Sequence, residues 1–269
     1  MVGLLAVGFA VLFGQRHRTA PSATGSAGEG AFAVLPVTDG RDPWAVAIRK
    51  AQLALKANVG DDQAWAQLGT AYVQEARITV NPVYYQKANG ALQRSFTLNS
   101  ATNLAALVGM GTLANAQHNF NGALVWGKRA QRLNRYNSAV YAVLDDALTQ
   151  LGRYPEATAA AQRMLNLRPG ISAFTRASYD FEERGDITGA RFALQQALQD
   201  ATSPADIGFC RYYLGELAFN QGKPADAAYQ YARGLQVDPN YDPLLEGKAK
   251  AEAALGQTSA AIRDYTAVV

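Results

Sequence analysis

Few side chains in this 269-residue sequence could carry out nucleophilic, acid–base or metal chemistry. The two histidines are His17 and His118, and the single cysteine is Cys210. A nucleophilic site needs a nucleophile beside a base, and a metal site needs several ligands that converge. Neither histidine has an acid or a cysteine at ligand spacing, and no phosphate-binding or dinucleotide-binding glycine motif occurs. We therefore expect no catalytic residue, no metal and no cofactor, and the chain is not predicted to be an enzyme.

The residues that remain have structural explanations. His118 is predicted to be a polar residue in a turn between helices, and Cys210, between aromatic neighbours, a half-buried structural thiol. One predicted helix carries a basic stripe of Lys128, Arg129, Arg132 and Arg135. We favour an ordinary solvated face for this stripe over a contact with nucleic acid or lipid head groups. The formal net charge of +3 is also too small to favour nucleic acid as a partner.

The N-terminal stretch Met1–Gly14 is apolar throughout, and basic residues follow it at once. It is shorter than the roughly 20 residues that span a bilayer. We interpret it as a membrane segment or signal anchor, with a buried N-terminal helix as the alternative. Residues 15–41 are predicted to be a flexible linker, because Thr19–Ala31 consists mostly of small and polar residues. The expected location is the cell membrane, single-pass or signal-anchored, and the side on which the rest of the chain lies stays open.

The rest of the sequence repeats with a period near 34 residues. Five similar hexapeptides occur, HNFNGA (118–123), GRYPEA (152–157), GDITGA (185–190), GKPADA (222–227) and GQTSAA (256–261). Each ends in alanine, and four of the five begin with glycine, which suits the left-handed residue that ends many helices. His118 takes that place in the first. Self-similarity at this period is typical of a helical solenoid.

The residues between these turns match a known repeat. Its W-x2-L-G-x2-Y pattern is occupied by Trp65, Leu68, Gly69 and Tyr72. The same template is fitted by Leu214, Gly215, Ala227, Tyr231 and Pro239, and by Tyr141, Leu144, Gly152, Ala157 and Pro169. Residues 62–269 thus resemble tetratricopeptide-repeat proteins, in particular bacterial membrane-anchored ones. The resemblance implies an all-α fold, a right-handed superhelical α-solenoid of helical hairpins.

The resemblance also implies how the repeats are arranged. About six repeats are expected over 62–269, starting near residues 62, 104, 138, 171, 208 and 242, the last incomplete, with residues 42–61 as a capping half-repeat. Small residues at Gly215 and Ala227 would let the two helices of a repeat pack closely, and Gly69 and Gly111 are equivalent to Gly215. The departures from the pattern are Asp145, Ser178 and Ala249 at that position, and Gly127 where a large side chain is usual. The first repeat is longer than the template, and we expect a loop within 78–85 that turns at Asn81–Pro82.

In this family, positions 2, 5, 9 and 12 of each repeat line the concave face. The predicted peptide-binding residues at these positions are Asp146, Tyr179, Glu182, Tyr212, Glu216 and Phe219. They make the face acidic and aromatic, so the predicted ligand is a protein or peptide segment with basic and apolar residues. The alternative is that the acids are only solvated and that the tyrosines pack into neighbouring repeats.

The predicted function is that of a non-catalytic scaffold or adaptor tethered to a membrane. The alternative is a targeting or regulatory arm of a larger enzyme or transporter component whose catalytic part lies outside this chain. The last predicted helix carries Ile262, Tyr265 and Val268 without a polar capping element. We therefore expect either further repeats or a capping helix in the native protein, or self-association through the C-terminal repeat.

Overall fold

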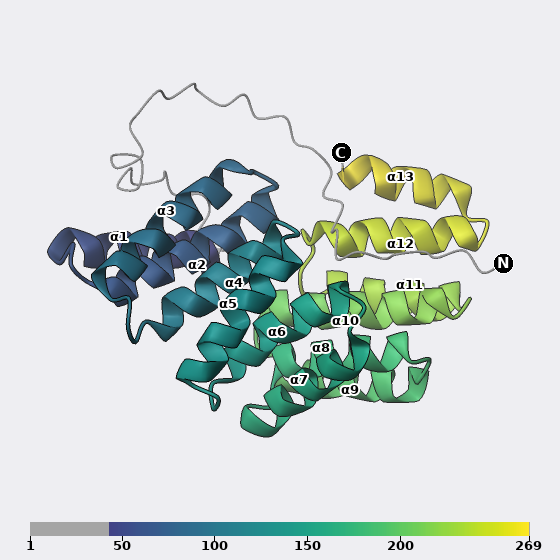
Figure 1. The fold of residues 1–269 in the computed structure, drawn as a ribbon. Helices are drawn as coiled ribbons and strands as arrows, with labels where there is room; N and C mark the ends of the chain where they lie inside the picture. The colour runs from purple at the N-terminus through teal and green to yellow at the C-terminus, as the bar shows by residue number, and fades with distance from the viewer. Residues whose placement is uncertain (1–42, 269) are drawn as a thin grey trace. The chain divides into compact units, whose positions relative to one another are not determined.

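The computed structural model describes residues 43–268, and this part of the chain is all-α. Its helices are α1 (Pro43–Ala57), α2 (Asp62–Thr79), α3 (Val83–Leu98), α4 (Leu104–Ala116), α5 (Phe120–Leu133), α6 (Ser138–Gln150), α7 (Tyr154–Leu167), α8 (Ile171–Glu183), α9 (Ile187–Asp200), α10 (Pro204–Asn220), α11 (Pro224–Leu235), α12 (Asp242–Ala254) and α13 (Thr258–Val268) (Figure 1). None of them is both long and apolar enough to cross a bilayer. The predicted membrane segment (1–14) and linker (15–41) lie outside the described residues.

The described chain divides into two compact units, residues 43–163 and residues 164–268. In the first unit α2 packs on α3, and α4 on α5; in the second, α8 packs on α9, α10 on α11, and α12 on α13. The first helices of successive hairpins also pack on one another, α2 on α4, α4 on α6, and α10 on α12. Hairpins that contact only their neighbours in the chain form a solenoid.

The turns within the hairpins have the predicted conformation. The four glycines that open these turns have φ angles between 70° and 76°, and His118, which opens the remaining turn, has a φ angle of 59°. A residue with a Cβ rarely adopts this left-handed conformation, which explains why glycine predominates. The alanine that ends each hexapeptide is at most 4% exposed in all five turns. The hexapeptide therefore specifies both the end of one helix and the first buried position of the next.

Close packing explains the glycines inside the first helices. A Cβ added to Gly69 or Gly111 would lie 2.5 Å from a side-chain carbon of an adjacent helix, and one on Gly215 would lie 2.3 Å from the ring of Tyr231. The close approach predicted at Gly215 is thus confirmed. Ser178, at the equivalent position, is buried, and its hydroxyl donates a hydrogen bond of 2.9 Å to the carbonyl of Ala190 in α9.

The departure at Gly127 has a similar explanation. Leu144 of α6 fills the space beside Gly127, where an added Cβ would lie 2.7 Å from it. The first hairpin turns between Thr79 and Val83, as predicted. Its additional residues do not form a long loop, however. They extend α2 to 18 residues and α3 to 16, whereas α4 has 13.

Each unit has its own apolar core. In residues 43–163 it is built around Trp65, Tyr72 and Leu92, and α1 covers it with Ile48 and Leu55. Two other apolar side chains of α1, Val46 and Leu53, face outward and are 54% and 57% exposed. In residues 164–268 one cluster surrounds the fully buried Tyr231, and another joins leucines of α9 and α10.

Candidate functional site

Helix α10 carries three of the predicted peptide-binding residues. Its N-terminus is capped by Ser203, whose hydroxyl accepts the N–H of Asp206 at 3.1 Å. Tyr212, Glu216 and Phe219 follow at spacings of four and three residues, which places them on one side of the helix. All three are partly exposed.

The ring of Tyr231 from α11 fixes α10 against α12. It fits between two glycines, since a Cβ on Gly215 or on Gly247 would lie 2.3 Å or 2.7 Å from the same ring carbon. Its hydroxyl donates a hydrogen bond of 2.6 Å to Glu216. The glycines thus let the backbones approach, and the hydroxyl holds the Glu216 carboxylate in place.

Polar contacts link α8, α10 and α12 along this side of the unit. Asn220 of α10 donates to Glu182 of α8 at 3.2 Å. The amine of Lys250 on α12 donates to both oxygens of Glu216, at 2.7 and 2.9 Å, and lies 4.4 Å from the centre of the Phe219 ring. We name this surface the first-helix face. It consists of Tyr179, Glu182, Tyr212, Glu216, Phe219, Glu246 and Lys250.

The electrostatics of the first-helix face are dominated by carboxylates. Burial raises the pKa of the Glu246 carboxyl, and Glu216 raises it further, while Lys250 acts in the opposite direction. Burial and the charges of Glu216 and Glu246 also raise the pKa of the Tyr212 phenol. Lys250 pairs with Glu216, and its charge also acts on Glu246. With Glu182, the face has three carboxylates and one ammonium group, which leaves an excess of negative charge.

The structure places five of the six predicted residues in one unit. Tyr179 and Glu182 lie on α8, and Glu182 is linked to α10 through Asn220. Asp146 lies on α6 in residues 43–163, so it belongs to the other unit.

Sequence reasoning missed Glu246 and Lys250. They are residues 5 and 9 counted from Asp242, the same positions that identify Tyr212 and Glu216 in the preceding repeat. The position rule, extended by one repeat, finds them.

The other candidate residues have the structural roles predicted for them. The thiol of Cys210 is fully buried, more deeply than predicted, and burial followed by the charge of Asp206 raises its pKa to about 12. His118 stands edge-on to Phe120 in its turn, with ring centres 5.6 Å apart.

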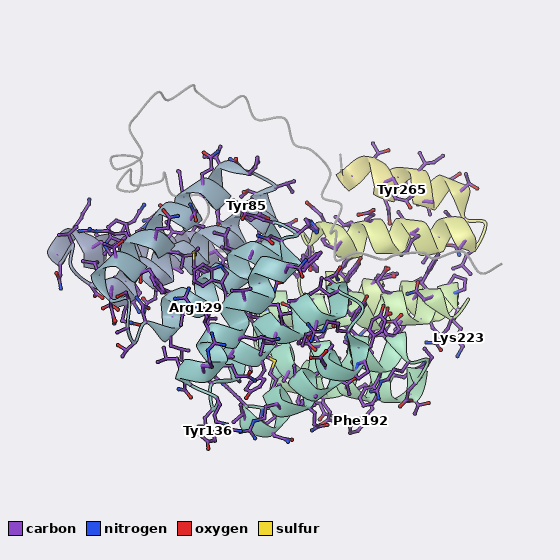
Figure 2. All side chains as sticks on the ribbon, in the orientation of Figure 1. Tyr85, Arg129, Tyr136, Phe192, Lys223 and Tyr265 are labelled. Carbon is purple, nitrogen blue, oxygen red and sulfur yellow. The ribbon has the colours of Figure 1, made fainter. Side chains whose placement is uncertain are left out.

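Of the predicted basic stripe, Lys128, Arg129 and Arg132 lie on α5, whereas Arg135 follows the end of the helix at Leu133, so the prediction of one helix face is wrong at Arg135. Lys128, Arg132 and Arg135 are exposed. Arg129, which is labelled in Figure 2, is half-buried, and its guanidinium lies 4.7 Å from the Trp126 ring centre and 5.3 Å from that of Phe96. The prediction of one continuous solvated face is therefore wrong at Arg129, because the planar guanidinium stacks on aromatic rings.

Comparison with known proteins gives matches of fold only. No family model and no curated protein matches the sequence. A thermophilic TPR protein of Thermus thermophilus, TTC0263, has a TM-score of 0.60 at 22% identity, over 72% of this chain and 98% of that one. The type IV pilus biogenesis factor PilW has a TM-score of 0.57 at 16% identity, over 75% and 92%. A chain of the APC/C hetero-tetramer Cut9–Hcn1 has a TM-score of 0.65 at 12% identity, over 83% of this chain and 42% of that one.

Proposed function

The chain has the tetratricopeptide-repeat fold, and on that basis we propose that it is a non-catalytic adaptor that binds an extended segment of a partner protein. The segment carries basic and apolar side chains and lies along the first-helix face, across α8, α10 and α12. The proposal includes attachment to a membrane through residues 1–14. Asp146 stays a separate candidate contact in the other unit.

The observation that carries the proposal is the shared lysine. Glu216 binds Lys250 directly, and Glu246 interacts with the same ammonium group. Glu182 adds a third carboxylate, on α8. This carboxylate accepts a hydrogen bond from the neutral amide of Asn220. A lysine or arginine side chain of a partner would supply the missing positive charge, and such charge complementarity favours both fast association and selection of the right partner.

The aromatic residues supply the apolar part of the proposed interface. Tyr212 and Phe219 flank Glu216 and are partly exposed. Tyr212 contacts the rings of Tyr213 and Tyr231, with ring centres 5.2 and 6.2 Å away. Its position is therefore fixed before a partner arrives. Rigid aromatic side chains lose little conformational entropy on binding and often dominate the binding energy.

Selection from a peptide library tests the proposal. Random peptides displayed on phage are selected on the full-length protein, and the chosen sequences are resynthesised for affinity measurement by fluorescence anisotropy. We expect enrichment of lysine or arginine together with apolar residues. Glu246→Gln should weaken binding of such a peptide about fivefold, the upper range for one exposed ion pair.

The structure selects both the variant and its control. Glu216 is unsuitable because its loss would leave the Tyr231 hydroxyl and Lys250 without their partner. Asp200→Asn removes one negative charge from the exposed end of α9 and should change the affinity less than twofold. Acidic selected peptides, or equal losses for the two variants, would contradict the proposal.

A further inference from the structure

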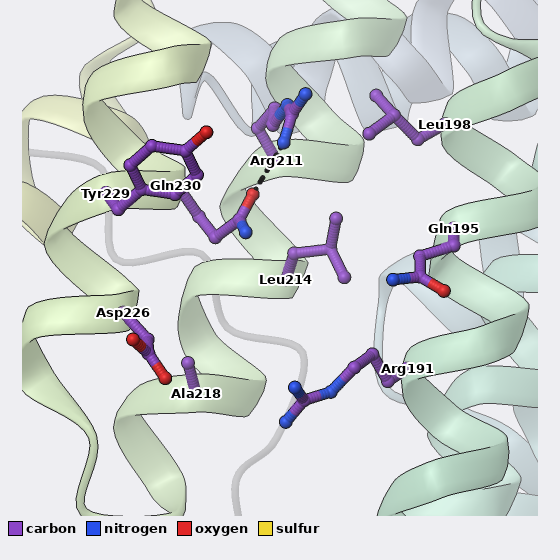
Figure 3. Close-up of a pocket in the computed structure, with 9 residues that line it drawn as sticks. All are labelled: Arg191, Gln195, Leu198, Arg211, Leu214, Ala218, Asp226, Tyr229 and Gln230. Atoms are coloured by element: carbon purple, nitrogen blue, oxygen red, sulfur yellow. Dashed lines mark hydrogen bonds between the residues drawn. The ribbon is translucent and has the colours of Figure 1, made fainter.

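The same unit contains a cleft on a different side of α10. The cleft lies between α9 and α11, with α10 as its floor, and has a volume of about 250 Å³ (Figure 3). Leu214 of α10 lines the cleft and precedes Glu216 by two positions. The side chains of these two residues therefore point about 200° apart around the helix axis. The cleft is therefore separate from the first-helix face.

Two arginines give the cleft its charge. Figure 3 shows Arg191 of α9 and Arg211 of α10 at opposite ends of the opening, with Leu214 between them. The nearest hydrogen-bond acceptors of both arginines are neutral amides. Arg191 donates to the side chain of Gln221 at 3.2 Å, and Arg211 donates to that of Gln230 at 2.7 Å.

Neither charge is neutralised by a carboxylate. Within residues 43–268, no carboxylate oxygen lies within 4.0 Å of either guanidinium. Burial lowers the pKa of Arg211, and the positive charge of Arg233 lowers it further. Asp226 lines the cleft, but it is exposed and lies in the first turn of α11, where the helix dipole stabilises an acid. Two arginines against one aspartate leave the cleft with a net positive charge, which an added anion would neutralise.

The rest of the lining is apolar or aromatic. Leu198, Leu214 and Ala218 form the apolar part, and Tyr229 of α11 also lines the cleft, with 59% of its surface exposed. The volume is below the roughly 300–1,000 Å³ of pockets for drug-sized ligands. A cleft of this size accommodates one or two side chains.

We propose that this cleft binds an acidic peptide segment that places a carboxylate against Arg191 and Arg211 and an adjacent aliphatic side chain against Leu214. Planar guanidinium groups pair with carboxylates through two parallel hydrogen bonds, and each arginine has N–H groups beyond the one that its glutamine uses. The inference does not depend on the proposed function, because it concerns another side of α10 and a ligand of the opposite charge. With both sites, this unit would hold a basic and an acidic segment at once.

Binding of a defined acidic peptide tests this inference. The probe is a fluorescent, end-blocked hexapeptide of alternating leucine and glutamate, titrated with the full-length protein and followed by anisotropy. The comparison peptide replaces each glutamate with glutamine. We expect saturable binding of the first peptide, at least about tenfold tighter than the second, and weakening as salt is raised.

Variants with matched controls locate the site. Arg191→Met keeps most of the apolar length of the side chain and should weaken binding about tenfold, whereas Arg263→Met, an exposed arginine of α13 in the same unit, should change it less than twofold. Tyr229→Ala should weaken binding severalfold more than Tyr265→Ala, a second exposed tyrosine. Circular dichroism of each variant verifies that it is folded.

Three results would overturn the inference. The first is equal affinity for the glutamate and glutamine peptides. The second is equal loss for Arg191→Met and Arg263→Met. The third is binding of inorganic phosphate alone as tightly as the glutamate peptide, which would make the cleft a simple anion site and not a peptide site.

Discussion

Replacing Gly215 with alanine tests whether close packing determines the sequence of α10. In an exposed helix this change would stabilise the protein by about 1 kcal/mol, because alanine favours the helix more than glycine does. In this structure the new methyl carbon would lie 2.3 Å from Cε1 of Tyr231 and 2.7 Å from two other ring carbons. Such distances require the ring to move.

The ring of Tyr231 has little room to move. It is fully buried, Gly247 of α12 contacts its other side, and its hydroxyl is bound to Glu216 at 2.6 Å. We therefore take the upper end, about 3 kcal/mol, of the range for overpacking a core. After the gain in helix propensity, Gly215→Ala should lower the free energy of unfolding by about 2 kcal/mol.

Gly208 of the same helix is the matched control. It is also buried, but a Cβ there would have its closest contact, with Tyr241, at 3.4 Å, an ordinary van der Waals distance. Gly208→Ala should therefore raise the free energy of unfolding by about 1 kcal/mol. The two variants should differ by about 3 kcal/mol although the chemical change is the same.

Urea unfolding of the full-length protein, followed by far-ultraviolet circular dichroism, measures both values. Tryptophan fluorescence is unsuitable because Trp44, Trp65 and Trp126 all lie outside residues 164–268. Adding Tyr231→Leu to the Gly215→Ala variant replaces the ring with a smaller side chain. This second change should recover part of the lost stability if the new methyl group and the ring collide. Equal stabilisation by Gly215→Ala and Gly208→Ala would refute the packing explanation.

Three further predictions concern other parts of the chain. Burial raises the pKa of both Cys210 and Tyr241 to about 12, so the folded state retains protons that the unfolded state releases. The urea midpoint should therefore fall as the pH rises above about 9, and Cys210→Ala should make this fall less steep. An unchanged midpoint would count against the burial of these groups. A chain without residues 1–38 should keep its helical circular dichroism and no longer sediment with membranes; loss of helix would show that this segment belongs to a core. Ile262 and Tyr265 of α13 are 61% and 41% exposed. Light scattering should detect concentration-dependent dimers that Tyr265→Glu abolishes, and a monodisperse monomer at all concentrations would contradict this; Tyr265 is labelled in Figure 2.

The repeat architecture could be predicted because the same pattern of residue types recurs several times in the sequence. Each hairpin turn needs a left-handed residue and then a small residue that fits between helices, and both requirements recur near every 34 residues. The glycine at 215 could likewise be assigned to close packing, since few other reasons justify its cost in a helix interior. Local conformation and the small size of a buried side chain are properties of single positions, so they are visible in the sequence.

The contacts of the candidate site could not be predicted in the same way. A position within a repeat indicates which side of the helix a side chain is on. It does not show that Lys250 of the next repeat pairs with Glu216 and covers Phe219, because that depends on side chains from two helices. The same holds for Arg129, which stacks on Trp126, and for the cleft, which needs α9, α10 and α11 together.

Photo-crosslinking shows directly whether a basic segment binds on the first-helix face. A basic and apolar peptide selected on the full-length protein is resynthesised with a benzophenone side chain, bound, irradiated and mapped by mass spectrometry. We expect crosslinks in α8, α10 and α12, at or beside Tyr212, Phe219 and Glu246, and their loss in competition with the unlabelled peptide. Crosslinks confined to α9 and α11, or to α5 around Lys128 and Arg132, would contradict binding on this face.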